Sequence, residues 1–100
     1  MELTNKQKAK LKSMAQHLNA IVRIGDKGVT ITVVDSMNEA LKARELVKFS
    51  VAHSDRKVRK EMIVELAKAT DAILVNIIGK TGLLFKVNLE NPIISEKLLM

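Results

Sequence analysis

Apolar residues recur along this chain with two different spacings. Apolar positions three or four residues apart indicate amphipathic helices, and short apolar or alternating runs indicate strands. The first helical pattern follows Thr4 and places four apolar residues on one side, namely Leu11, Met14, Ala15 and Leu18. Thr4 and Gln7 have the spacing of a capping box, in which each side chain accepts a hydrogen bond from the backbone N–H of the other residue. The sequence therefore predicts a helix that begins directly after Thr4.

Two further helices are predicted in the middle of the chain. One covers residues 29–43, where Thr30 is the expected N-cap because its hydroxyl oxygen can accept a bond from an unpaired backbone N–H. The other follows a cap at Ser54 or Asp55 and continues to Thr70. The apolar sides of these two helices consist of Val33, Val34, Met37, Ala40 and Leu41 in the first, and of Val58, Met62, Ile63, Leu66 and Ala69 in the second.

Four shorter apolar or alternating runs predict β-strands, and they cover residues 21–24, 46–52, 73–78 and 83–87. The last two runs are separated by Gly79-Lys80-Thr81-Gly82, which predicts a hairpin loop. The element order is then α-β-α-β-α-β-β. It predicts an α/β (α+β-like) fold with a four-stranded mixed sheet packed with helices. Two right-handed strand–helix–strand crossovers are expected to put parallel strands together, and the final hairpin to add an antiparallel strand.

A chain of 100 residues is long enough for one compact domain, which we assign to residues 1–88. Residues 89–100 have no clear period and are expected to form a C-terminal tail, an extra element or a disordered segment. No apolar stretch approaches the roughly 20 residues of a membrane span. Residues 1–12 lack the apolar region of a secretory signal, and the chain has no cysteine. These features predict a cytoplasmic protein that does not bind membranes.

The chain carries 17 Lys and Arg against 11 Asp and Glu, for a formal net charge of +6. Such a surface attracts polyanions. The predicted first helix carries two pairs of lysines four residues apart, Lys6 with Lys10 and Lys8 with Lys12. Like charges at this spacing destabilise a helix by a few tenths of a kcal/mol per pair, so their presence favours an anionic partner. The alternative is a solvated lysine-rich face.

A second basic cluster begins the predicted third helix and consists of Arg56, Lys57, Arg59 and Lys60. A glycine-bracketed turn, Gly25-Asp26-Lys27-Gly28, joins the first predicted strand to the second helix. Glycines without side chains at the start of a helix allow a nucleic-acid backbone to approach main-chain N–H groups. The alternative is an ordinary strand-to-helix turn.

The sequence shows no recognisable catalytic motif. Gly79-Lys80-Thr81 resembles the end of a phosphate-binding P-loop, but Leu74 occupies the position where that motif requires glycine. His17 and His53 are the only imidazoles, and without cysteine they are too few for a zinc site. We therefore expect a binding module without enzymatic activity, metal, cofactor or small-molecule substrate.

Only two aromatic residues are present, Phe49 and Phe85, so base stacking on rings cannot dominate binding to a single strand. A lysine-rich chain with so few rings is suited to gripping the phosphates of folded or double-helical RNA. Two other readings stay open. One is a general nucleic-acid (RNA or DNA) binding module, and the other is a protein–protein adaptor whose basic surface provides solubility.

Four blocks along residues 2–88 resemble, in order and spacing, the YhbY-like RNA-binding proteins, which consist of a single CRM domain of the chloroplast RNA splicing and ribosome maturation family. The blocks are Leu3-Thr4-Asn5-Lys6-Gln7 with Leu11-Lys12, Ile24-Gly25-Asp26-Lys27-Gly28-Val29-Thr30, Glu45-Leu46-Val47-Lys48, and Ile78-Gly79-Lys80-Thr81 with Leu84-Phe85-Lys86.

The resemblance implies a fold similar to the C-terminal domain of translation initiation factor three, with a Gly-x-x-Gly loop similar to that of KH domains. It also implies association with RNA of the large ribosomal subunit precursor, as a ribosome assembly factor. Carried over by position, the RNA-binding residues are Gly25, Asp26, Lys27 and Gly28, with Lys6, Lys8, Lys10, Lys12, Lys80 and Lys86 as neighbouring contacts. Asp26 is acidic where the family more often has a basic or neutral residue, so we expect Lys27 and backbone N–H groups to hold a phosphate.

Overall fold

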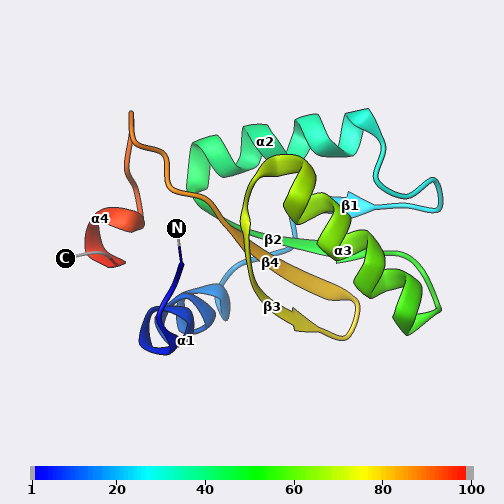
Figure 1. Ribbon diagram of the computed structural model, residues 1–100, viewed down its shortest axis with the longest axis horizontal. Helices are drawn as coiled ribbons and strands as arrows, with labels where there is room; N and C mark the ends of the chain where they lie inside the picture. Colours follow the sequence, from blue (N-terminus) through cyan, green and yellow to red (C-terminus); the bar gives the residue numbers. More distant parts are fainter. Residues whose placement is uncertain (1, 99–100) are drawn as a thin grey trace.

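The computed structural model describes residues 2–98. Residue 1 of the expected domain and residues 99–100 of the expected tail lie outside the described residues. The elements are α1 (Asn5–Ala15), β1 (Val22–Ile24), α2 (Ile31–Arg44), β2 (Leu46–Val51), α3 (Arg56–Thr70), β3 (Ile73–Ile78), β4 (Thr81–Phe85) and α4 (Ser95–Leu98). The expected order of the first seven elements is confirmed, and a short fourth helix follows them (Figure 1).

The strands form one mixed sheet in the order β1-β2-β4-β3. β1 and β2 are parallel neighbours, as expected for the first crossover. The expectation of a second parallel pair was wrong, because β4 lies between β2 and β3 and is antiparallel to both. Four of the five β4 residues are buried, so a central position removes more apolar surface from water than a position at the edge would.

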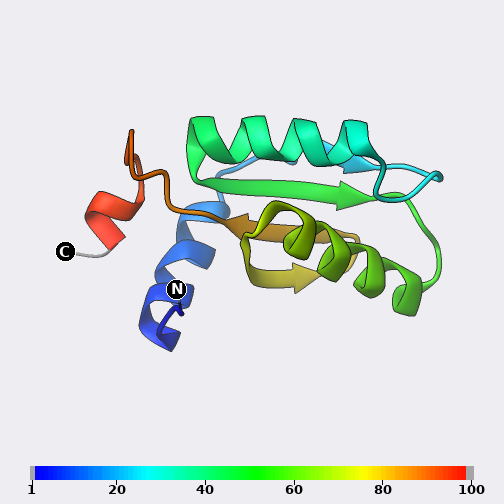
Figure 2. The same ribbon diagram turned by 45° about the horizontal axis from the view of Figure 1, so that its top comes forward.

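Helices cover both faces of the sheet, as Figures 1 and 2 show. On one face, α2 and α3 enclose a core that includes Met37, Leu41, Ile63, Phe49 and Leu84. On the other face, α1 and α4 pack near the beginning of β2 and the end of β4, in a second cluster that contains Leu11, Ala15, Leu46, Phe85 and Leu98. The second face is therefore covered mainly at one end.

The structure confirms the predicted N-caps of α1 and α2, although α2 begins at Ile31, two residues after the predicted start. Thr4 Oγ1 accepts from the backbone N–H of Gln7 at 3.1 Å, and Gln7 Oε1 accepts from the N–H of Thr4 at 2.9 Å, which confirms the capping box. Thr30 caps α2 through Val33 N–H. Of the two candidates for α3, Asp55 is the N-cap. Within α3, Ala67 is buried and Ala69 is exposed, so the expected apolar side was wrong at Ala69.

The hairpin differs from the sequence prediction. Its turn contains two residues, Gly79 and Lys80, and β4 begins at Thr81, two residues earlier than expected. Gly79 has φ +56°, as the first position of such a tight turn requires. Gly82 lies inside β4 beneath the Phe49 ring, and a Cβ on Gly82 would overlap ring atoms. This glycine is therefore used for packing and not for the turn.

The segment after β4 folds back onto the end of α2, where Glu45 is completely buried. The Glu45 carboxylate accepts four backbone N–H groups and the Ser95 hydroxyl, all from residues 88–95. Burial by itself raises the pKa of Glu45, but hydrogen bonds from Ser95, Asn88 and Ile93 lower it more, and the resulting pKa is about 2. Glu45 is therefore a carboxylate that holds the C-terminal segment against the domain.

Candidate nucleic-acid interface

The glycine-bracketed turn lies between β1 and α2. The backbone N–H of Gly28 donates to Gly25 O at 3.0 Å, which closes a turn whose two central residues, Asp26 and Lys27, are exposed. Gly28 has φ +76°, a conformation that favours glycine. The space above Gly25 is open, since no atom lies within 4 Å of where a Cβ would be. The main chain at Gly25 is thus accessible to a ligand backbone.

This turn belongs to one end of the sheet, shown on the right of Figure 1. The carboxyl ends of β1 and β2 meet there, because the N–H of Ala52 donates to Ile24 O at 2.9 Å. The β3–β4 turn lies at the same end, since the N–H of Val51 donates to Lys80 O at 2.8 Å. The tertiary structure therefore places Lys27 and Lys80 at the same end of the molecule, although the sequence separates them widely.

The basic cluster of α3 joins the same end. Arg56, Arg59 and Lys60 line a cleft of about 480 Å³ together with Ile77 and Gly79 of the β3 side. Arg59 Nη1 donates to the carbonyls of His53 at 2.8 Å and Ser54 at 2.9 Å, so its guanidinium holds the link between β2 and α3. Arg56 and Lys60 are exposed. Together with Lys27 and Lys80, these exposed cations form what we call the turn-end basic surface.

The sequence identified the cluster of α3 but did not connect it with the glycine turn. The connection depends on the β2–α3 crossover, which brings the first turn of α3 beside Gly79. In the sequence, the only indication that the start of α3 lies near Gly79 was the predicted strand–helix–strand crossover. The parallel strands of a crossover end at the same edge of the sheet.

The lysines of α1 lie elsewhere. Lys6, Lys10 and Lys12 are exposed, Lys8 is half-buried, and Lys10 Nζ donates to Lys97 O of α4 at 3.4 Å. The molecule measures 39 × 24 × 23 Å, and both views place α1 and the glycine turn toward opposite ends of the long axis (Figures 1 and 2). The expected contacts on α1 and on the turn are therefore two separate basic regions.

Lys86 has a structural partner at the end of the sheet opposite the glycine turn. Its Nζ donates to Thr70 O at 2.8 Å, at the C-terminus of α3. Lys48 does the same for α1, because its Nζ lies 3.4 Å from Ala15 O and 3.3 Å from Leu18 O. Cations at these positions satisfy the last carbonyls of a helix and complement its dipole. A role of Lys86 in RNA binding stays a prediction.

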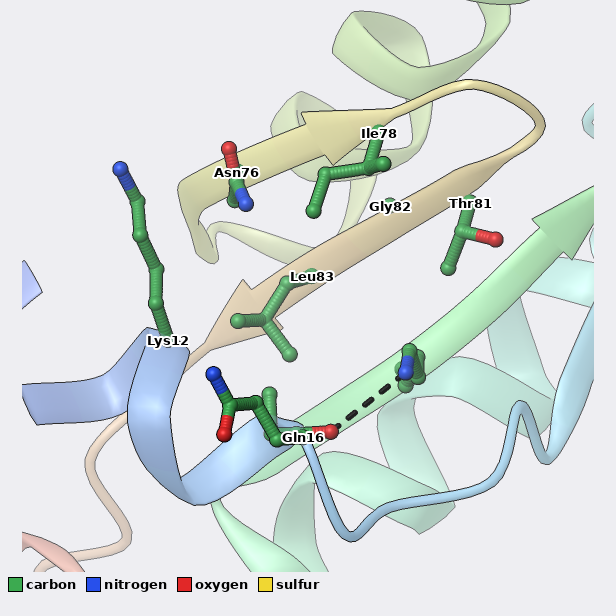
Figure 3. A pocket seen from close by; sticks show the side chains of 9 residues that line it. Lys12, Gln16, Asn76, Ile78, Thr81, Gly82 and Leu83 are labelled. Carbon is green, nitrogen blue, oxygen red and sulfur yellow. Dashed lines mark hydrogen bonds between the residues drawn. The ribbon is translucent and has the colours of Figure 1, made fainter. Parts of the chain in front are cut away.

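A groove separates α1 from the uncovered part of the sheet (Figure 3). It has a volume of about 330 Å³. Its lining comes from α1, the residue that caps the C-terminus of α1, and three strands, and it consists of Lys12, Ala15, Gln16, Lys48, Asn76, Ile78, Thr81, Gly82 and Leu83. The groove reaches from α1 to the strand ends beside Gly79 and Lys80, so it lies between the two basic regions.

Among residues 2–98, no three side chains of His, Cys, Asp or Glu lie close enough together to hold a metal ion. No helix within those residues is both long enough and apolar enough to span a lipid bilayer.

Comparisons with known proteins give a consistent result. A family model described as the CRS1 / YhbY (CRM) domain matches residues 3–86. The chain is 39% identical over 89 residues to "Probable RNA-binding protein YqeI" of Bacillus subtilis, with 89% of this chain and 93% of that protein covered. It is 36% identical over 91 residues to an "RNA-binding protein" of Haemophilus influenzae, with coverage of 91% and 92%.

The fold is also similar to a solved structure, the solution structure of hypothetical protein SAV1595 from Staphylococcus aureus. The TM-score is 0.78 at 32% sequence identity, and the match covers 90% of this chain and 94% of the other. The expected similarity of sequence and fold to one family of proteins is thereby confirmed.

Proposed function

The chain belongs to the CRS1/YhbY (CRM) domain family, and from this premise we propose that it binds precursor RNA of the large ribosomal subunit and assists the assembly of that subunit in the cytoplasm. It acts as a binding protein and not as an enzyme. RNA as the partner is supported by relatives that are named RNA-binding proteins. The ribosomal role is supported by the resemblance of the four sequence blocks to single-domain ribosome maturation proteins.

The observation that carries the proposal is the turn-end basic surface. Lys27, Lys80, Arg56 and Lys60 are all exposed at the end of the sheet where the glycine turn lies. Cations clustered in this way neutralise several phosphates at once and release counterions, which gives most of the affinity for a nucleic-acid backbone. We infer that the RNA backbone crosses this end of the molecule.

The glycine turn fits a phosphate for two further reasons. The open space at Gly25 allows close approach of a sugar-phosphate chain. The turn is followed directly by the N-terminus of α2 at Ile31, whose positive dipole end attracts anions. Lys27 at the centre of the turn adds a full positive charge. Asp26 beside it opposes this attraction, so we assign the main charge contact to Lys27.

Crosslinking of the tagged protein to RNA in growing cells, followed by sequencing of the bound fragments, tests the proposal. The informative variant is Lys27→Glu, and the matched control is Lys68→Glu, which makes the same charge change at an exposed position in the last turn of α3. We expect fragments of large-subunit precursor RNA with the wild type and with the control, and a clear depletion of these fragments with Lys27→Glu.

Two results would contradict the proposal. Fragments spread evenly over many messenger RNAs would replace the assembly role by general RNA binding. Equal crosslinking of Lys27→Glu and Lys68→Glu would remove the glycine turn from the interface. Binding of purified protein to RNA and duplex DNA at several salt concentrations separates the remaining alternatives, because a phosphate-binding surface loses affinity steeply as salt rises.

A further inference from the structure

We infer that the groove between α1 and the uncovered part of the sheet holds one unpaired nucleobase of the bound RNA, whose edge is read by the side-chain amides of Asn76 and Gln16. This inference rests on the proposed function and adds a site for base recognition to a surface that otherwise contacts phosphates. It is supported by the shape of the groove, by the β-bulge that directs Asn76 into it, and by the charges at its two ends.

The groove offers an apolar surface where the chain has no exposed aromatic ring. Phe49 and Phe85 are completely buried, so neither can stack on a base. Ile78, in contrast, is 70% exposed and lies on the wall of the groove opposite α1 (Figure 3). Gly82 lines the groove with its backbone alone, because a Cβ at this position would point to the other face of the sheet, toward Phe49. The volume of about 330 Å³ lies at the lower end of the range for small-ligand sites, about 300–1,000 Å³.

A β-bulge in β3 places Asn76 in this groove. The strand register shifts between Leu74 and Asn76. Val75 still faces the core beneath α1, and without the bulge Ile77 would be the next residue on that face. After the bulge, Ile77 instead packs on the side of α3, and Asn76 and Ile78 line the groove. Bulges commonly redirect side chains at functional sites.

The two amides are available for a ligand. Figure 3 marks one hydrogen bond among the nine lining residues, from Lys48 Nζ to the carbonyl of Ala15, and it involves neither Asn76 nor Gln16. An amide carries a donor and an acceptor side by side, which matches the paired donors and acceptors on the edge of an unpaired base. Bases inside a duplex have these edges occupied and cannot enter the groove.

Charges at both ends of the groove complement the phosphates on either side of such a nucleotide. Lys12 of α1 stands at one end, and Lys80 lies in the turn directly after Ile78 and Gly79 at the other. Both side chains are exposed. An RNA strand that places a base in the groove therefore also passes from the lysines of α1 to the turn-end basic surface. One RNA strand would therefore contact both of the separate basic regions.

The test measures binding of labelled RNA stem–loops that share one stem and differ in a loop of only adenosine, uridine, cytidine or guanosine. The fully paired stem serves as the duplex probe, and free adenosine monophosphate as the mononucleotide probe. The variant is Asn76→Leu, which keeps the side-chain size and removes the amide. The matched control is Asn38→Leu on the exposed side of α2. Circular dichroism melting verifies that each variant folds.

We expect the wild type to prefer one or two of the four loops over the duplex. Asn76→Leu should lower the affinity for the preferred loop about tenfold, the order expected for loss of one amide–base contact, and bring the four loops close together. Asn38→Leu should retain the preference. The side-chain amide NMR signals of Asn76, identified by their absence in the variant, should shift with the preferred loop and not with the duplex.

Several outcomes would overturn the inference. Equal affinities of Asn76→Leu and wild type for all four loops would exclude base recognition by this amide. A shift of the Asn76 signals with adenosine monophosphate but with none of the loops would assign the groove to a free nucleotide. Both results leave the proposed function intact if Lys27→Glu still weakens binding of the duplex. If the wild-type protein bound none of these RNAs, that result would instead contradict the proposed function itself.

Discussion

Replacement of Glu45 by glutamine is expected to destabilise the domain and release its C-terminal segment. Oε1 accepts from the backbone N–H groups of Ile93 at 2.6 Å, Ile94 at 2.6 Å and Ser95 at 2.9 Å. Oε2 accepts from Asn88 N–H at 2.7 Å and from Ser95 Oγ at 2.7 Å. Glutamine keeps one oxygen, but its NH₂ group cannot accept a bond. One of the two sets of donors is therefore left buried without a partner.

The magnitude follows from the pKa of this carboxyl group. Its pKa falls from an ordinary value of 4.5 to about 2 in the folded protein. A shift of this size corresponds to about 3 kcal/mol of folding free energy at neutral pH. Loss of hydrogen bonds to a charged acceptor gives a similar figure, about 1.5–3 kcal/mol for each bond lost. We expect Glu45→Gln to lower the free energy of unfolding by about 3 kcal/mol.

The same shift predicts a specific pH dependence. Because the folded-state pKa is depressed, the contribution is complete above pH 4.5 and is lost as the pH falls toward about 2. The wild-type protein should therefore lose about 3 kcal/mol across this window from Glu45 alone. The Gln variant lacks the titrating group and should show a correspondingly smaller change.

Urea unfolding followed by circular dichroism, at neutral pH and at several acidic pH values, measures both effects. Glu90→Gln is the matched control, because it makes the same change at an exposed position in the same segment. The reasoning is refuted if Glu45→Gln and Glu90→Gln have equal stability at neutral pH. It is also refuted if wild type and Glu45→Gln lose stability in parallel between pH 4.5 and about 2.

Three substitutions test the packing and the basic surface. Gly82→Ala should lower the free energy of unfolding by about 1–3 kcal/mol in urea titrations, because its Cβ would overlap the Phe49 ring. A free energy of unfolding equal to that of wild type would contradict this packing. Gly25→Ala should change stability by less than about 0.5 kcal/mol, since its Cβ meets open space, and yet weaken RNA binding. Arg56→Glu should lower RNA affinity and reduce the slope of log affinity against log salt by about 1 relative to Lys68→Glu, and an unchanged slope would remove Arg56 from the interface.

Local interactions made much of the fold predictable from the sequence. The Thr4–Gln7 capping box, the Thr30 cap and the apolar sides of α1 and α2 all depend on residues within a few positions of one another. The glycine turn was identified for the same reason, because its four residues are consecutive. Interactions of this kind form within a short segment and do not depend on residues far away in the chain.

Long-range contacts decided the features that the sequence did not indicate. The position of β4 between β2 and β3 depends on which strand gains most by burial on both sides, and no local pattern expresses this. The β-bulge that turns Asn76 into the groove likewise follows from pairing with β4. Glu45 reads as an ordinary acidic residue at a helix end, because all of its donors come from residues 43 to 50 positions later.

The candidate site divides in the same way. The sequence by itself determined that the protein is basic, that it carries a glycine turn before a helix, and which family it resembles, since these are properties of composition and of short consecutive motifs. Only the tertiary structure decided that Arg56 and Lys60 join Lys27 and Lys80, that Lys86 is bonded to the end of α3, and that α1 forms a separate region. These relations are set by how strands and helices pack across the sheet, and such packing joins residues that are far apart along the chain.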